Sequence, residues 1–146
     1  MDQANQQTTK TKKIKLDFKD SKYATGRRKR SIAKVWVKKG SGNIHVNGLK
    51  MNEYFKRPVH QIIVTRPLEI SEVATNYDVK CSVKGGGLSG QAGAIILGIS
   101  KALISHEENL KKVLKKDKLT TRDSRVVERK KYGHRKARRS FQFSKR

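Results

Sequence analysis

Residues 129–146 have a composition suited to binding phosphate. These eighteen residues include nine Lys or Arg, one His and no carboxylate. With little apolar surface and much like charge, such a segment does not collapse by itself, so we expect it to order on a polyanion. Tyr132, Phe141 and Phe143 are interleaved with the charges and would allow stacking on bases. The candidate phosphate ligands are Arg129, Lys130, Lys131, Arg135, Lys136, Arg138, Arg139, Lys145 and Arg146.

A second basic block lies near the other end of the chain, directly after Gly26. A run of charge is ordinarily a solvated face of a protein. Because a basic segment is also present at the opposite end, we interpret this block as a second RNA-binding element. Its members are Arg27, Arg28, Lys29 and Arg30.

A glycine-rich loop at residues 85–90, GGGLSG, matches the G-x-G-x-x-G pattern of dinucleotide-binding folds. That chemistry needs an acidic residue at the end of a second parallel strand, but here a helical pattern runs directly into Glu107. The loop also departs from the phosphate-binding P-loop, because Gln91 and Ala92 stand where Lys and Ser or Thr are required. Two interpretations remain: the glycines permit a tight turn, or their backbone amides meet an RNA phosphate. The residues in question are Gly85, Gly86, Gly87, Ser89 and Gly90.

The net charge of +24 is concentrated at the two ends of the chain. Residues 1–39 contribute +10 and residues 111–146 contribute +13, whereas residues 40–110 hold seven basic and six acidic side chains. The near-neutral centre also carries most of the apolar periodicity, which predicts one small folded core with basic arms. We therefore divide the chain into a polar extension at 1–22, a globular domain at 23–128 and a basic tail at 129–146.

Several classes of protein fit the sequence poorly. The longest apolar run, residues 92–99, is too short to span a membrane. Residues 1–22 contain acidic residues and no Arg, unlike an organellar presequence. The single Cys and four scattered His predict neither a disulfide framework nor a metal site. No Ser–His–acid set or paired carboxylates can be nominated, so we expect no catalysis, no cofactor and no small-molecule substrate.

Alternating apolar residues predict strands at 31–39, 44–46 and 77–84, the first two joined as a hairpin through the turn at 40–43. Val126 and Val127 predict a last short strand. Cys81 is expected to point into the core, and Trp36 to pack rather than to act as a base-stacking platform.

Helical periodicity is strongest at 92–103, and a second, Lys-rich helix is predicted at 110–114. Residues 51–55 and 59–65 predict shorter helical pieces, interrupted by Pro58 and ended before Pro67. Strands and helices thus alternate. The simplest fold is a mixed α/β domain in which helices cover a sheet of about four strands.

Five stretches of the chain resemble the small ribosomal subunit protein nine family in its bacterial and organellar form. They are YATGRRKR at 23–30, GNIHVNG at 42–48, KGGGLSGQAGA at 84–94, LTTRDSRVVERKKYG at 119–133 and KARRSFQFSKR at 136–146. The resemblance covers residues 23–146. One departure is Ile96, which stands where the family often has Arg. We expect Ile96 to extend a packed surface or to meet a neighbouring protein instead of RNA.

The resemblance implies a fold like the second domain of ribosomal protein five and a place in the head of the small ribosomal subunit. The implied partners are small-subunit ribosomal RNA, neighbouring head proteins and the transfer RNA of the peptidyl site. Lys145 and Arg146 would face that transfer RNA, and the more proximal basic residues would bind ribosomal RNA. A free-standing nucleic-acid chaperone and a nucleotide-dependent enzyme remain alternatives. The compartment stays open between the bacterial cytoplasm and the mitochondrial matrix.

Overall fold

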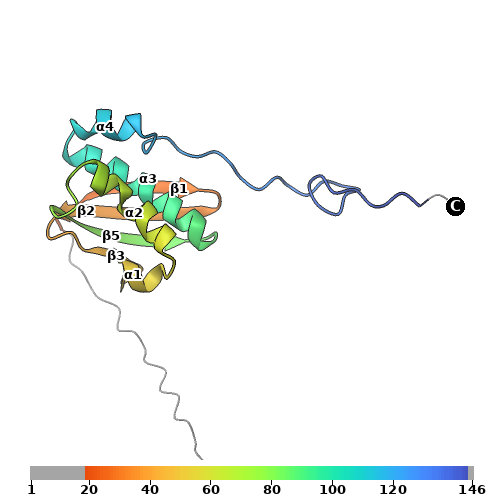
Figure 1. The fold of residues 1–146 in the computed structure, drawn as a ribbon, viewed down its shortest axis with the longest axis horizontal. Coiled ribbons are helices and arrows are strands. Elements are labelled where there is room, and N and C mark those ends of the chain that lie inside the picture. Colours follow the sequence, from red (N-terminus) through yellow and green to blue (C-terminus); the bar gives the residue numbers. More distant parts are fainter. Residues whose placement is uncertain (1–18, 145–146) are drawn as a thin grey trace, which may run out of the picture.

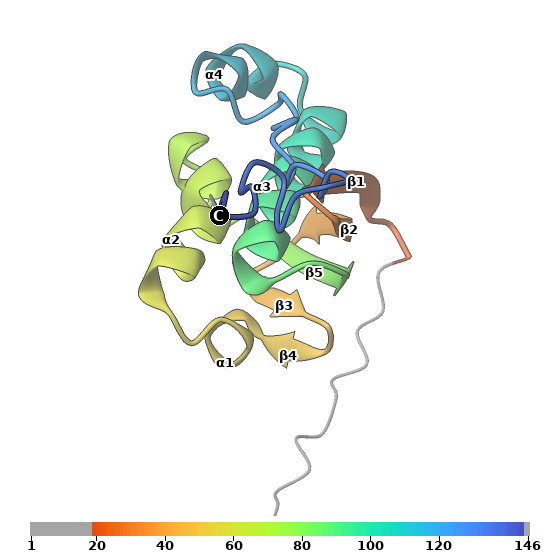
Figure 2. The same cartoon turned by 90° about the vertical axis from the view of Figure 1, so that its right-hand side faces the viewer.

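The computed structural model describes residues 19–144, in which one five-stranded sheet carries helices on one face (Figures 1 and 2). The strands run in the spatial order β1-β2-β5-β3-β4. All neighbours are antiparallel except β3 and β5, which are parallel. The strands are β1 (Lys22–Arg28), β2 (Ser31–Lys39), β3 (Ile44–Val46), β4 (Leu49–Lys50) and β5 (Tyr77–Lys84). The helices are α1 (Met51–Tyr54), α2 (Pro58–Ile70), α3 (Leu88–His106) and α4 (Leu110–Lys116).

The core forms between the alternating apolar side chains of the central strands and one side of α3. Val35 of β2 is paired with Cys81 of β5, and both are buried. Ile95 and Ile99 of α3 are fully buried in the same cluster. Cys81 lies in the core as predicted, and burial raises the pKa of its thiol. Helix α3 is long and apolar enough to cross a membrane by length and composition, but 61% of its most apolar stretch is buried inside the protein.

Close contact of α3 with β1 and β2 depends on two glycines. A Cβ atom added to Gly26 would overlap the carbonyl oxygen of Ala94, and a Cβ added to Gly98 would reach the side chain of Val35. The backbone of the helix therefore rests almost directly on β1.

The predicted mixed α/β fold is confirmed, but the strand list differs from the prediction. Strand β1 was not predicted, because its charged residues and Gly26 hide the alternation. The strand forms by pairing with β2 at seven positions, from Lys22 opposite Val37 to Arg28 opposite Ser31. The predicted strand at Val126 and Val127 is wrong: both side chains are exposed and no ladder pairs them in the described chain.

The predicted hairpin between residues 31–39 and 44–46 is also wrong, because β5 lies between β2 and β3. Asp78, near the start of β5, explains the altered path. Its carboxylate accepts hydrogen bonds from the backbone amides of Ser41 and Asn43 at 3.0 and 2.9 Å. The turn is thus held over β5, and β3 continues parallel to that strand.

Helix α2 does not end before Pro67, as the sequence had suggested. Pro58 lies in its first turn, where a missing amide costs nothing, and Pro67 lies inside the helix. Pro67, Val64 and Leu68 are all buried. Tertiary packing of this face therefore outweighs the local cost of the second proline.

Candidate nucleic-acid interface

Arg28, the last residue of β1, lies on the helix-covered side of the sheet. Gly93 of α3 gives it room, because a Cβ at Gly93 would overlap the Arg28 side chain. The Arg28 side chain is only 26% exposed, and its Nε atom is buried without a hydrogen-bond partner. A partly buried guanidinium beside an open recess is suited to holding an anion.

A recess of about 260 Å³ opens beside Arg28 between α2, α3 and the segment that follows α4. Its charged lining comprises four cations and one carboxylate, so its potential favours an anionic ligand. Ile96 lies in this lining and also packs against the core, which agrees with its predicted role in a packed surface. The charged residues are Arg27, Arg28, Arg66, Lys118 and Asp123.

The basic turn between β1 and β2 lies beside the glycine-rich loop. Ser31 donates a hydrogen bond from its hydroxyl to the carbonyl oxygen of Gly85 at 3.0 Å. A Cβ on Gly85, which has a φ of +77°, would lie 2.6 Å from the carbonyl oxygen of Arg30. The structure thus brings together the predicted block at 27–30 and the predicted loop at 85–90, which the sequence separates by more than fifty residues.

The glycine-rich loop forms a tight strand-to-helix connection. Gly85 and Gly86 both have positive φ, as the turn interpretation requires. Gly87 caps α3 without a side-chain hydrogen bond, and a Cβ there would meet open space. In the described chain no strand follows α3, so the second strand of a dinucleotide-binding unit is missing. The start of α3 is exposed, so a phosphate could reach its backbone amides. Binding of an RNA phosphate by this loop stays a prediction.

The C-terminal segment leaves the body beside Arg28 and extends away from it (Figure 1). Asp123 bridges Arg28 and Arg125, at 3.3 and 2.9 Å respectively. Hydrogen bonds from the guanidinium and backbone of Arg125 hold the pKa of the Asp123 carboxyl well below its usual range, with a smaller contribution from Arg28. Asp123 therefore stays ionised and ties the base of the segment to β1.

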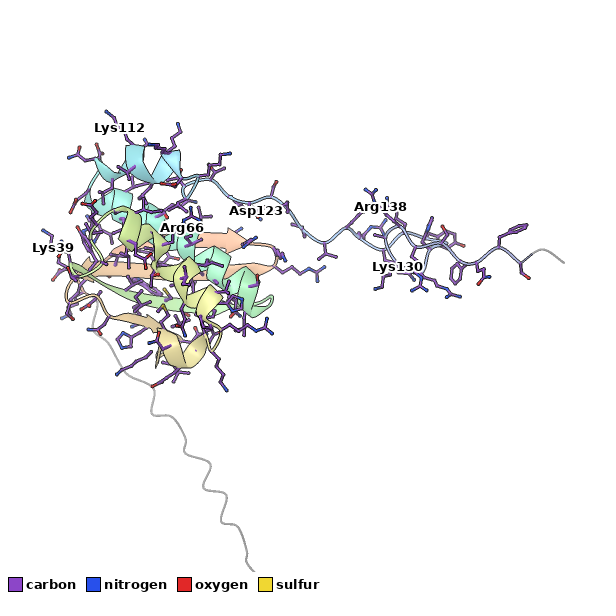
Figure 3. The ribbon with its side chains drawn as sticks, viewed as in Figure 1. Lys39, Arg66, Lys112, Asp123, Lys130 and Arg138 are labelled. Carbon is purple, nitrogen blue, oxygen red and sulfur yellow. The ribbon has the colours of Figure 1, made fainter. Side chains whose placement is uncertain are left out.

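Farther along, residues 128–140 form a loop that is held by internal ion pairs and hydrogen bonds. Glu128 pairs with Lys131 at 2.8 Å and with Arg138 at 2.9 Å, and these contacts lower the pKa of its carboxyl. The backbone amide of Arg135 donates to the carbonyl of Arg139 at 2.8 Å. In Figure 3 the labelled Lys130 and Arg138 lie on this loop, far from Arg66 and Lys39 on the body.

The predicted site residues therefore fall into two groups. Residues 27–30 and 85–90 meet at one end of the body, whereas the basic residues from 129 to 139 form a separate, exposed cluster on the distal loop. Lys145 and Arg146 lie outside the described residues. Arg66 and Lys118 were not predicted, because they join Arg28 only through the packing of α2 and of the segment after α4.

The sequence matches the family model for ribosomal protein S9/S16 over residues 26–146. The chain belongs to the ribosomal protein S9/S16 family. As a member of this family it is a structural protein of the ribosome that binds ribosomal RNA and contacts ribosomal neighbours. The match includes the basic turn at 27–30, the recess beside Arg28 and the whole C-terminal segment. Ribosomal RNA is thus the polyanion that the clustered cations of this S9/S16 protein bind.

Proposed function

We propose that this chain is a non-enzymatic constituent of the small-subunit head, anchored on ribosomal RNA through its body, with a tail that contacts transfer RNA in the peptidyl site. The observation that carries the proposal is the separation of the two cationic regions. One surrounds Arg28 on the folded body, and the other lies on a segment that projects from it (Figures 1 and 3). A body and a projecting arm of this kind can hold two RNA molecules at once.

The body contacts would use residues 27–30, with the partly buried Arg28 as their centre, and the exposed turn of α3 next to them. A phosphate in the recess would pair with the Arg28 guanidinium, which lines the recess and is partly exposed. The distal loop would neutralise further ribosomal RNA phosphates. Its proposed ligands are Arg129, Lys130, Lys131, Arg135, Lys136, Arg138 and Arg139.

The transfer-RNA contact is assigned to Lys145 and Arg146, which follow the aromatic pair Phe141 and Phe143. Arg135 lies over the Phe141 ring at 5.1 Å from its centroid, so the segment directly before the terminal pair is partly organised.

Removal of Lys145 and Arg146 from subunits tests this assignment. We expect the truncated chain to enter small subunits at the normal level and those subunits to retain peptidyl-site transfer RNA less tightly. The control replaces two lysines of α4, Lys111 and Lys112, by Gln, which removes the same charge from the body. Unchanged transfer-RNA retention after truncation, or a loss of incorporation into the subunit, would contradict the assignment.

A further inference from the structure

The sheet face opposite α2 and α3 carries a pair of aromatic rings in contact with each other. Tyr23 of β1 and Trp36 of β2 are paired across the ladder, with ring centroids 5.3 Å apart and planes inclined by 42°. The Tyr23 residue is 49% exposed. None of the described helices lies on this face (Figure 2). Trp36 packs against Tyr23, as predicted, but it is only partly buried. The pair therefore leaves ring surface open to a ligand, which the sequence-based expectation of packing alone did not include.

Lysines surround the aromatic pair. Lys80 of β5 lies opposite Trp36 in the ladder, with its ammonium 6.0 Å from the Trp36 ring centroid. Lys34 lies two residues before Trp36 on the same face and is exposed. Asp78 is the only carboxylate in the sequences of β1, β2 and β5, so lysines outnumber acids on these strands. The face is therefore aromatic and strongly cationic.

The charge selects the kind of molecule that can cover this face. Residues 1–18 of the chain itself carry more lysines than aspartates, so their net charge is positive and they fit poorly. An apolar protein surface would take the ammonium groups out of water without offering them an anion. A single-stranded RNA offers both of the required groups, because its phosphates pair with ammonium groups and its flat bases stack on aromatic rings.

We propose that the Tyr23–Trp36 pair is a stacking site for an unpaired RNA base, with the adjoining phosphates held by Lys34 and Lys80. The inference rests on the proposed role in RNA binding. It adds a second site on the face of the sheet opposite the Arg28 recess, built from different residues. Strands β1, β2 and β5 would thus bind RNA on one face while the other face holds the core.

Trp36 is the only tryptophan in the chain, so its fluorescence reports on this site alone. The experiment titrates the full-length protein with a short single-stranded RNA carrying a terminal label. Anisotropy of the label measures total binding, and Trp36 emission measures occupancy of the sheet face. We expect quenching of Trp36 that saturates together with the anisotropy. Inorganic polyphosphate, which has charge but no bases, is expected to bind without comparable quenching.

Two matched substitutions localise the effect. Tyr23→Ala removes half of the stacking pair at an exposed position and is expected to weaken binding measured by Trp36 quenching roughly fivefold or more. Val59→Ala removes an exposed apolar side chain from α2, outside all of the proposed RNA contacts, and should leave that quenching unchanged. Circular dichroism establishes that both variants keep the fold.

RNA that raises the anisotropy without quenching Trp36 would overturn the stacking site and leave the proposed RNA-binding function intact. Equal quenching by polyphosphate would also overturn it, since charge alone would then suffice. Quenching by a poly-glutamate peptide but not by RNA would assign the face to an acidic protein segment instead. Absence of any RNA binding would contradict the proposed function together with this site.

Discussion

Arg28 at the end of β1 and Asp123 at the base of the C-terminal segment form an ion pair, with 3.3 Å between the guanidinium nitrogen and the carboxylate oxygen. This pair joins the folded body to the projecting arm. Asp123 also holds Arg125 through its side chain and its backbone amide. One carboxylate therefore fixes where a strongly basic segment leaves the protein.

Replacement of Asp123 by Asn should loosen the base of the segment. The amide keeps the shape of the side chain but loses its charge, so the contact with Arg28 weakens. We expect tryptic cleavage after Arg122 and Arg125 to accelerate roughly two- to fivefold, the range for loss of an exposed ion pair. Asp117→Asn, which removes the same charge after α4, is the control. Equal cleavage rates in the two variants would show that the Arg28 contact does not restrain the segment.

Gly93→Ala should separate RNA binding from stability. An added methyl group at Gly93 overlaps the Arg28 side chain, which must leave its present position. Alanine favours the helix over glycine by up to about 1 kcal/mol, so the thermal midpoint should stay the same or rise. RNA affinity at fixed salt should fall. Ser105→Ala, at an exposed position near the opposite end of the same helix, is the control. Normal RNA affinity in Gly93→Ala would remove Arg28 from the interface.

Tyr77 links stability to alkaline pH. Its hydroxyl donates a hydrogen bond to Glu107 at 2.6 Å, and burial together with this contact raises the pKa of Tyr77 from 10.0 to about 12. The unfolded chain therefore loses the phenol proton first. The stability contributed by Tyr77 is complete below pH 10.0 and is lost as the pH rises towards about 12.

Tyr77→Phe should accordingly lower the free energy of unfolding by about 1 kcal/mol at neutral pH. The difference between wild type and variant should shrink as the pH rises above 10.0. Urea unfolding at several pH values measures both effects, with Tyr132→Phe on the exposed loop as the control. A difference that stays constant across this pH range would contradict the role of the Tyr77 proton.

The elements that the sequence predicts well are those with strong periodicity and a buried face. Strands β2 and β5 and helix α3 carry uninterrupted alternation or a sustained helical period, and burial in the structure follows the same pattern. Cys81 was placed in the core for this reason. Strand β1 was not predicted because its buried position is Gly26, which has no apolar side chain to show the alternation. The glycine instead lets the backbone of α3 approach the strand closely.

The errors arose where long-range contacts decide the local path. Asp78 redirects the turn at 41–43 although it lies more than thirty residues away, and burial of Pro67 carries α2 through a residue that usually ends helices. The residues that line the recess were hard to predict for the same reason. Arg28 was a candidate from charge alone, but its association with Arg66 and Lys118 depends on packing that no short motif encodes.

The salt dependence of RNA binding should report how many phosphates the distal loop neutralises. Replacing Arg135, Arg138 and Arg139 by Gln should reduce the slope of log affinity against log salt by roughly 0.7–0.9 for each phosphate that is no longer neutralised. The control replaces Lys111, Lys112 and Lys115 of α4, which removes the same charge from another exposed region. Equal changes in slope would mean that binding follows total charge and not the loop.

The central claim is that this chain is a small-subunit ribosomal protein held on RNA. A sucrose-gradient profile of lysate at moderate and at high salt, with each fraction probed for the chain, tests it most directly. The account predicts that the chain sediments with the small subunit in both conditions. A chain that spreads through the light fractions, or follows bulk nucleic acid instead of one particle, would contradict the account and favour a free-standing nucleic-acid chaperone.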